Sequence, residues 1–345
     1  MKRAREYGFT IGELPTGPRN LITDVAGVKV GHVTISDAEH NTGVTVVLPC
    51  EDNPFASKLT AASHVLNGFG KTAGLMQIEE LGTLETPIAL TNTLNVGLVH
   101  DAMVGYMIHR CEQDGIPLRS VNPIVCECND ASLNDICHRA VRAEHVRTAL
   151  MTASSDFALG AVGAGRGMTC HGLKGGIGSA SRVIELAGHS YTLGVLALTN
   201  HGRLNDLTLQ GHNIGRTIQR QMAESLPDKG SCIVVMATDL PLSDRQIRRV
   251  IRRAGVGHAR LGSYTGHGSG EVFLGFTTAN RVPHSSDQAL LPMTVLQEDH
   301  IDIAFRAMAE AAEEAVLDSM LMAETVVSAS GVVRRSLSDF ASLFS

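Results

Sequence analysis

Two patterns of hydrophobic and polar residues alternate along this 345-residue chain. Continuous apolar runs bounded by Gly, Pro or Asn predict buried strands, and apolar residues spaced three to four positions apart predict helices. Because both patterns recur throughout, we expect a layered α/β or α+β body with a largely buried sheet. The predicted strands span residues 25–32, 42–48, 87–92, 124–127, 191–200 and 272–278, with another beginning at Ser231, and the predicted helices span 95–111, 133–149, 206–225, 242–254 and 301–325.

Residues 61–81 are rich in small side chains, and Asn67-Gly68-Phe69-Gly70 divides them into an expected loop and a short helix. No repeat, low-complexity segment or linker is evident, and the length suits one large unit or two closely interlocked ones. Hydrophobic residues make up 43% of the chain but aromatic residues only 4%, so we expect an aliphatic core.

The formal net charge of -6 argues against nucleic acid as the main partner. Arg248, Arg249, Arg252 and Arg253 recur at helical spacing and are interpreted as a solvated helix face. No apolar run approaches the ~18 residues that span a bilayer, and no apolar segment follows the basic N-terminus. The seven scattered cysteines suit a reducing compartment. We therefore expect a cytoplasmic protein that binds neither nucleic acid nor membrane.

Ser231 stands where a Pro-Asp-Lys-Gly turn, residues 227–230, leads directly into an apolar run. Gly230 places an uncrowded carbonyl just before this hydroxyl, because glycine has no side chain. By itself the arrangement predicts only a loop that enters a strand.

Two glycine-rich segments, 163–167 and 175–178, resemble nucleotide-binding loops but match neither established pattern. The first lacks the spacing of G-x-G-x-x-G, and residues 172–175 lack the Gly-Lys-Ser/Thr of a phosphate loop. Tight backbone turns, or backbone donors that line a pocket, are the favoured interpretation.

Metal binding is a second possibility, because the chain has 15 His and seven Cys. No CxxC, HExxH or Asp-rich calcium loop is present, so we expect satisfied buried side chains, no metal and no cofactor. The local pairs are Cys126 with Cys128, Cys137 with His138, and Cys170 with His171.

Ser269-Gly270-Glu271 places a hydroxyl and a carboxylate side by side just before a predicted strand. The segment lacks the G-x-S-x-G spacing of a nucleophile elbow. Such a pair can instead support a nucleophile that comes from another part of the chain.

Together these segments resemble the DmpA-type L-aminopeptidase/D-amidase/D-esterases and the β-peptidyl aminopeptidases. Members of this family are self-cleaving N-terminal nucleophile (Ntn) hydrolases. The resemblance extends nearly from end to end and rests on many motifs in family order. These motifs are residues 22–32, 42–45, 90–93, 127–130, 133–135, 174–182, 230–231, 234–239 and 268–271.

By this resemblance Ser231 is the nucleophile, and it becomes a new N-terminus when the bond after Gly230 is cut. The products are an α chain of residues 1–230 and a β chain of residues 231–345. A serine hydroxyl needs an adjacent base. Self-cleavage creates one, because an α-amino group has a pKa of ~7.7–8.0 and is partly neutral near working pH.

The resemblance implies further catalytic and binding residues. Asn200 helps to form the oxyanion hole, and Ser269 and Glu271 form hydrogen bonds around the nucleophile and its amine. Glu127 holds the free ammonium group of the substrate. Asn129 stands where some D-esterases have a substrate-contacting Tyr, so the preference among L-, D- and β-amino acyl groups stays open.

The implied fold is a single-domain, four-layer αββα sandwich, similar to that of ornithine acetyltransferase, in a homotetramer. The implied substrates are short peptides and aminoacyl amides or esters. Three alternatives remain: an amidase for non-peptide amides, an acyltransferase of the ornithine acetyltransferase type, and a non-catalytic protein that binds a ligand at the glycine-rich segments.

Overall fold

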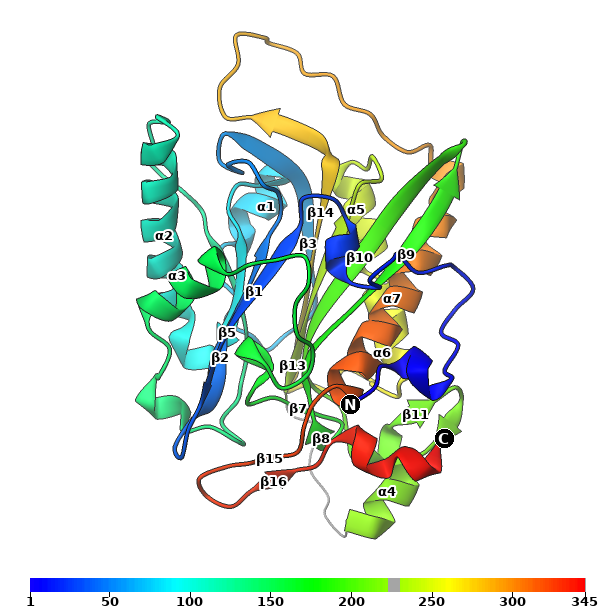
Figure 1. Ribbon diagram of the computed structural model, residues 1–345. Helices are drawn as coiled ribbons and strands as arrows, with labels where there is room; N and C mark the ends of the chain where they lie inside the picture. The colour runs from blue at the N-terminus through cyan, green and yellow to red at the C-terminus, as the bar shows by residue number, and fades with distance from the viewer. Residues whose placement is uncertain (223–229, 345) are drawn as a thin grey trace.

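Two β-sheets packed face to face form the centre of the molecule, and helices cover the outer face of each (Figure 1). The computed structural model describes residues 1–222 and 230–344. The large sheet has the order β4 (Thr83–Leu84), β3 (Ser57–Gly68), β14 (Gly270–Pro283), β13 (Ser231–Thr238), β10 (His189–Asn200) and β9 (Gly176–Leu186). The small sheet has the order β1 (Lys29–Ser36), β2 (Asn41–Leu48), β5 (Ile88–Asn92) and β6 (Ile124–Cys128).

The helices divide between the two outer faces. On the small sheet lie α2 (Val96–Gln113) and α3 (Ala143–Met151), and on the large sheet lie α5 (Asp244–Ile251), α6 (Ala254–Arg260) and α7 (Asp302–Leu321) (Figure 1). Two short helices, α1 (Leu75–Leu81) and α4 (Gly215–Met222), lie at the periphery. The predicted αββα sandwich is thus confirmed.

Strand β13 shows how the sequence builds the layers, because it is buried on both faces. Its side chains alternate with period two, as in any strand. Cys232, Val234 and Met236 join the core beneath α7, whereas Ile233 and Val235 join the core between the sheets. A continuous apolar run is therefore required here.

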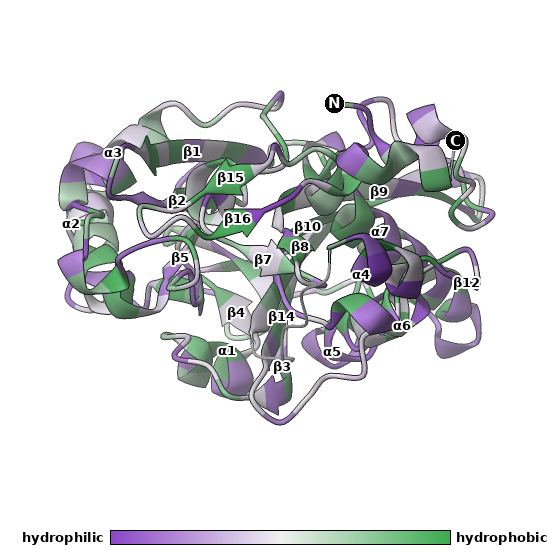
Figure 2. Cartoon of the chain, turned by 90° about the horizontal axis from the view of Figure 1, so that it is seen from below, coloured by the Kyte–Doolittle hydropathy of each residue, from purple (hydrophilic) through white to green (hydrophobic). Residues whose placement is uncertain are grey.

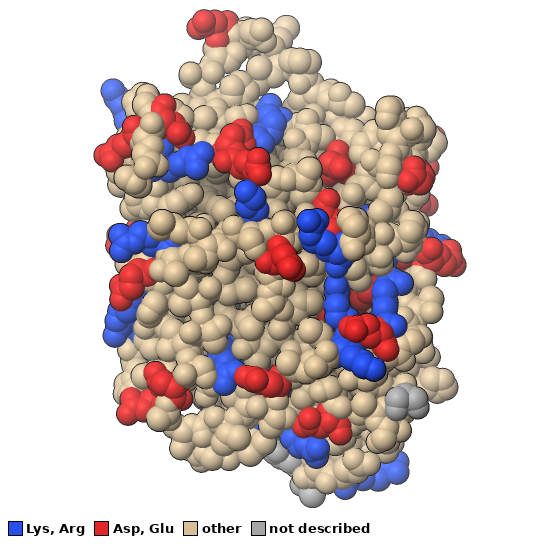
Figure 3. Space-filling model, viewed as in Figure 1, with Lys and Arg blue, Asp and Glu red and all other residues tan. Residues whose placement is uncertain are grey.

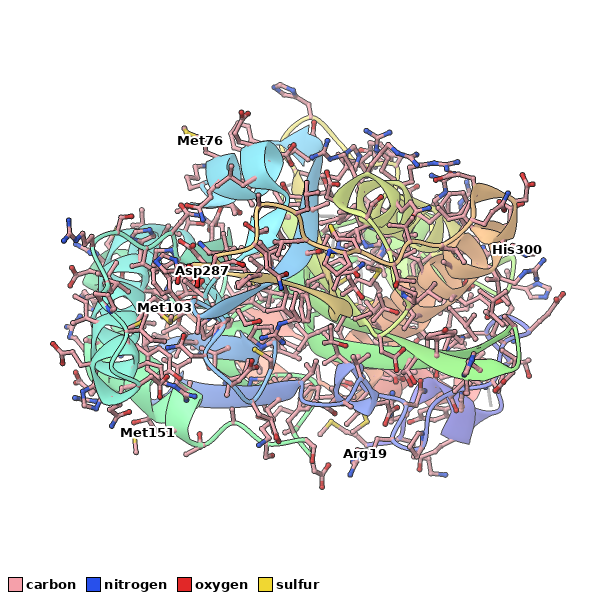
Figure 4. All side chains as sticks on the ribbon, turned by 90° about the horizontal axis from the view of Figure 1, so that it is seen from above. Arg19, Met76, Met103, Met151, Asp287 and His300 are labelled. Carbon is pink, nitrogen blue, oxygen red and sulfur yellow. The ribbon has the colours of Figure 1, made fainter. Side chains whose placement is uncertain are left out.

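A third core lies between the small sheet and its two helices, and it includes Met103 of α2. Met76 and Met151, by contrast, are exposed at the periphery (Figure 4). Among the residues that the structure describes, no helix has the length and apolar character needed to cross a bilayer.

The glycine-rich segments pack backbone against backbone. A Cβ added to Gly165 would lie 2.6 Å from the nitrogen of Ile177, and one added to Gly178 would lie 1.7 Å from the carbonyl oxygen of Ala315. The buried amine of Lys174 donates to three carbonyl oxygens, those of Gly165, Met168 and Gly175. These glycines therefore allow close packing of backbone against backbone, a role that neither of the two favoured interpretations named.

Three predicted elements differ from the structure. Strand β3 occupies the first part of the 61–81 segment, where no strand was expected, whereas the expected short helix of this segment is present as α1. The helix expected from residue 133 begins at Ala143, because residues 136–138 form a 3-10 turn instead. The helix expected over 206–225 is interrupted by the hairpin β11 (Thr208–Leu209) and β12 (His212–Asn213), whose Gly211 has a φ of +82° that a helix does not tolerate. The last residues of that prediction, and most of the 227–230 turn, lie outside the described residues.

The arginine-rich run lies on α5 and on the two residues that join α5 to α6, and ion pairs partly neutralise it. Arg248 pairs with Glu79 and Arg249 pairs with Glu298. Acidic and basic side chains are interspersed in the same way over the face seen in Figure 3. The run is half-exposed, as expected for a solvated helix face, but its charges have local partners.

Candidate active site

A pocket of about 710 Å³ opens where the ends of several strands meet. Glu127 of β6, Asn200 at the end of β10 and Ser231 at the start of β13 all line it. The hairpins β7–β8 (Thr169–Cys170, Leu173–Lys174) and β15–β16 (Val326–Val327, Val333–Arg334) lie at this same end, which faces the viewer in Figure 2. The pocket thus collects residues that are far apart in the sequence.

The strand register places Asn200, Ser231 and Gly270 side by side. Ser231 pairs with Asn200 across the antiparallel strands β10 and β13, and with Gly270 across the parallel strands β13 and β14. Adjacent strands lie about 4.8 Å apart, so a group bound at the Ser231 hydroxyl is within reach of both neighbours.

Gly230 is held tightly between β10 and β14, just before β13 begins. Its carbonyl oxygen accepts a 3.0 Å hydrogen bond from the N–H of Gly270. A Cβ at this position would lie 1.7 Å from the carbonyl oxygen of Asn200. Only glycine therefore lets the chain enter β13 along this path.

The side-chain amide of Asn200 is fixed on both of its polar atoms. Its Oδ1 accepts a 2.8 Å hydrogen bond from the N–H of Thr169, and its Nδ2 donates a 2.9 Å bond to the carbonyl oxygen of Asn129. An amide nitrogen has two N–H groups, so a second donor remains for a negatively charged oxygen in the pocket.

Glu127 is a buried carboxylate with an exposed fraction of 3%. Its two oxygens accept from the N–H of Lys71, at 2.9 Å, and from the hydroxyl of Thr93. Within residues 1–222 and 230–344, it forms no ion pair. Because a buried negative charge is costly without a partner, this carboxylate favours a cationic group in the pocket.

Ser269 and Glu271 are fully buried on either side of Gly270, the strand neighbour of Ser231. The hydroxyl of Ser269 donates to Oε1 of Glu271. Asn67 holds the preceding loop by donating to the carbonyl oxygens of Gly266, at 3.1 Å, and of Ser269. Ser269 and Glu271 are therefore held by hydrogen bonds next to the start of β13.

Two side chains near Ser231 are unsuited to act as its base. Burial raises the pKa of the Cys128 thiol well above its ordinary value, so this thiol stays protonated at neutral pH. His201 lines the pocket, and burial holds its pKa well below the ordinary range. Neither ring nitrogen of His201 forms a hydrogen bond to a described residue, so it makes no Ser–His pair with Ser231.

Five residues named in the sequence analysis line one pocket, namely Glu127, Asn129, Asn200, Gly230 and Ser231, and Ser269 and Glu271 flank Gly270 beside Ser231 without lining that pocket. The Oδ1 of Asn129 accepts from the N–H of Ala131, so its side chain closes a turn, and its carbonyl oxygen is what contacts Asn200. Thr93, Thr169 and Asn67 were not predicted as site residues, because their contacts depend on the tertiary fold. Only Thr93 carried a signal, because it falls in one of the recognised motifs.

The chain is similar in sequence to a family of peptidases and to proteins of that family. The family model "Peptidase family S58" matches residues 20–334. The β-peptidyl aminopeptidase BapA of Sphingosinicella microcystinivorans is 36% identical over 353 residues, which cover 95% of this chain and 88% of that protein.

Solved structures agree with this assignment. The PH0078 protein of Pyrococcus horikoshii OT3 is 44% identical with a TM-score of 0.93, covering 99% of this chain and 98% of that one. The L-aminopeptidase D-Ala-esterase/amidase of Ochrobactrum anthropi, described as a variant of the Ntn hydrolase fold, is 34% identical with a TM-score of 0.91, covering 99% and 97%. The resemblance found in the sequence is therefore confirmed, and the chain belongs to peptidase family S58 and has the Ntn hydrolase fold.

Proposed function

We propose that this protein is a self-processing serine aminopeptidase or amidase whose nucleophile is Ser231. The observation that carries the proposal is the row of Asn200, Ser231 and Gly270 across three adjacent strands, with the carboxylate of Glu127 in the same pocket. The family assignment, and the names of the relatives described above, support the same class of reaction.

Self-cleavage is the first step of the proposed mechanism. The hydroxyl oxygen of Ser231 attacks the carbonyl carbon of Gly230, the C–N bond breaks, and an ester joins Gly230 to Ser231. Water hydrolyses this ester to give chains of residues 1–230 and 231–345. The N–H of Gly270, 3.0 Å from the Gly230 oxygen, is placed to stabilise the charge that develops there.

Substrate hydrolysis then uses the same hydroxyl. The new α-amino group of Ser231 takes the hydroxyl proton during attack on the substrate carbonyl and returns it to the leaving amine. Asn200 donates to the oxyanion, Ser269 and Glu271 hold the amine, and water releases the acyl group. Glu127 binds the substrate ammonium, which restricts cleavage to the first residue.

The proposed substrates are short peptides and aminoacyl amides or esters with a free amine. The relatives described above are named as a β-peptidyl aminopeptidase and an L-aminopeptidase D-Ala-esterase/amidase, so β-, L- and D-amino acyl substrates all belong in a first screen. The pocket has room for such molecules, because sites for small ligands commonly measure ~300–1,000 Å³.

We also propose assembly into a homotetramer of processed units. The segment 284–295 forms a long loop after β14 (Figure 1). It carries exposed apolar side chains, among them Leu290, Met293 and Val295, which suit a contact between subunits. Light scattering during gel filtration tests this assembly, and a monomer at micromolar concentration would contradict it. The cytoplasmic location remains a prediction.

Gly230→Ala is expected to slow self-cleavage on the order of 10²-fold, because displacement by about 1 Å removes the attacking atoms from their reactive geometry. The added Cβ would lie 1.7 Å from the Asn200 oxygen, so the bond to be cut must shift. A time course on a denaturing gel measures the rate. Gly105→Ala is the control, because its added Cβ meets no atom within 4 Å. Equal rates in both variants would contradict the prediction.

Asn200→Ala is expected to lower kcat by about 10²–10³-fold, the usual effect of removing one oxyanion donor. Asn200→Asp keeps an acceptor for the Thr169 N–H but loses the Nδ2 donor, so it should be equally impaired. Steady-state kinetics on an aminoacyl amide measures kcat and KM separately. Activity of the Asp variant close to wild type would remove Asn200 from the oxyanion hole.

Matched substrates test the proposed function most simply. Purified protein is incubated with an aminoacyl amide and with its N-acetylated form, and we expect hydrolysis of the free amine alone. Equal hydrolysis of both would favour an amidase for non-peptide amides. Transfer of the acyl group to an added amine, faster than to water, would favour an acyltransferase, and no turnover at all would favour a ligand-binding protein.

A further inference from the structure

Three polar side chains form a buried cluster behind the nucleophile, between the large sheet and α6. They are His201, which follows Asn200 at the end of β10, Cys232, which follows Ser231 on β13, and His258 of α6. One ligand atom from each lies within 4.8 Å of the other two. The mechanism proposed above uses none of the three.

The hydrogen bonding of this cluster is incomplete. Neither ring nitrogen of His201 has a hydrogen-bond partner among the described residues, and the same holds for Nδ1 of His258. His201 is 2% exposed and His258 is fully buried, so bulk water does not satisfy them. Buried polar atoms in native proteins almost always have partners, and exceptions call for an explanation such as an ion.

The geometry suits a transition metal. The Cys232 Sγ and His258 Nε2 atoms lie 3.6 Å apart. Two such ligands on one tetrahedral zinc ion lie about 3.5 Å apart, given Zn–S of about 2.3 Å and Zn–N of about 2.0–2.1 Å. The rings of His201 and His258 are stacked with centroids 4.9 Å apart, so one ring must turn about its side-chain torsions before nitrogens of both rings can face one ion.

We propose that Cys232, His201 and His258 form a binding site for one Zn²⁺ ion per chain. A thiolate with two imidazoles is a ligand set that zinc prefers over Mg²⁺ or Ca²⁺, which favour oxygen ligands. This inference is independent of the proposed hydrolase activity, since it rests on different side chains.

Binding of the ion requires neutral imidazoles at His201 and His258 and a thiolate at Cys232. The ion would therefore replace the thiol proton of Cys232, and one proton would be released to solvent.

The position of the site suggests its role. A bound ion would join the end of β10, the start of β13 and α6, directly beside Asn200 and Ser231. It would therefore fix the spacing of these two residues, and it would stabilise the folded state in proportion to occupancy. The pocket gives the ion a path of entry, because His201 lines its wall.

The test is the metal content and the cobalt spectrum of the full-length protein. After purification under reducing conditions, or after chelation and reloading with Zn²⁺, elemental analysis should find one equivalent per chain. Replacing Zn²⁺ by Co²⁺ should give a thiolate-to-cobalt charge-transfer band. Cys232→Ser should lose this band, and His258→Gln should bind the ion more weakly. Added Zn²⁺ should raise the Tm of wild type but not that of Cys232→Ser.

Cys170→Ser is the matched control, because Cys170 is another fully buried cysteine and belongs to a neighbouring group with His171 and His201. It should retain the zinc equivalent and the cobalt band. Loss of the band in Cys170→Ser as complete as in Cys232→Ser would overturn the assignment of ligands. A reduced wild-type protein that binds neither Zn²⁺ nor Co²⁺ after gel filtration would overturn the site itself, whatever its peptidase activity.

Discussion

Ser231→Ala is expected to leave the 345-residue chain whole and to abolish hydrolysis of aminoacyl amides. The variant has no hydroxyl to attack the Gly230 carbonyl or a substrate carbonyl, so one substitution removes both reactions. Loss of a catalytic serine in a serine protease lowers kcat by about 10⁶-fold, and we expect a loss of that order here. A denaturing gel and an amide-hydrolysis assay measure the two effects.

Two further variants show whether the effect of Ser231→Ala comes from the lost hydroxyl or from misfolding. Ser231→Thr keeps a hydroxyl and should cleave itself slowly. Ser263→Ala removes another buried serine, outside the pocket, and should be cut and active like wild type. Fragments ending at residue 230 in the Ser231→Ala protein would contradict the assignment of the nucleophile.

Glu127→Gln is expected to lower kcat/KM for free-amine substrates by about 30- to 4,000-fold while leaving self-cleavage intact. Removal of one partner of a buried charge pair typically costs about 2–5 kcal/mol. The variant keeps an acceptor for the N–H of Lys71 but loses the charge that pairs with the substrate ammonium. Self-cleavage involves no ammonium, so the gel should show two chains.

The control for this prediction is Glu79→Gln, which alters a carboxylate that pairs with Arg248 on α5, away from the pocket. Its kcat/KM should match that of wild type. Glu127→Gln with unchanged kinetics would show that the substrate amine binds elsewhere. A Glu127→Gln protein that also remained uncut would show that the carboxylate serves folding rather than recognition.

The layered fold was predictable where local pattern and tertiary position agree. Strand β13 is buried on both faces, so its continuous apolar run predicts a buried strand directly. Helix α5 begins after Ser243, whose side chain accepts from the N–H of Gln246 in a capping box, and the sequence predicted a helix over residues 242–254.

Strand β3 was not predictable, because its assignment depends on its neighbours. Its residues Ala61, Ala62 and Ser63 are small and lack the β-branched character of a strand. They are buried because β3 lies between β4 and β14 in the large sheet. The helix predicted over residues 206–225 was wrong for a different reason. The apolar residues have helical spacing, but the turn at Gly211 interrupts the helix.

The candidate site was also predictable only in part. The residue types of Ser269-Gly270-Glu271 indicated a supporting polar pair, and the resemblance to a known family indicated the roles of Ser231, Asn200 and Glu127. The groups that orient them come from distant segments, as with the Thr169 N–H on Asn200. His201 was not among the cysteine and histidine pairs considered from the sequence, and its lack of a hydrogen-bond partner among the described residues is a feature that only the fold reveals.

Intact-mass measurement of the denatured wild-type protein, with sequencing of its N-termini, shows whether the chain cuts itself before Ser231. We expect two polypeptides, residues 1–230 and 231–345, with Ser231 as the first residue of the smaller one. A single 345-residue chain that nevertheless hydrolyses aminoacyl amides would contradict the proposed mechanism, because the α-amino group proposed as the base would not exist.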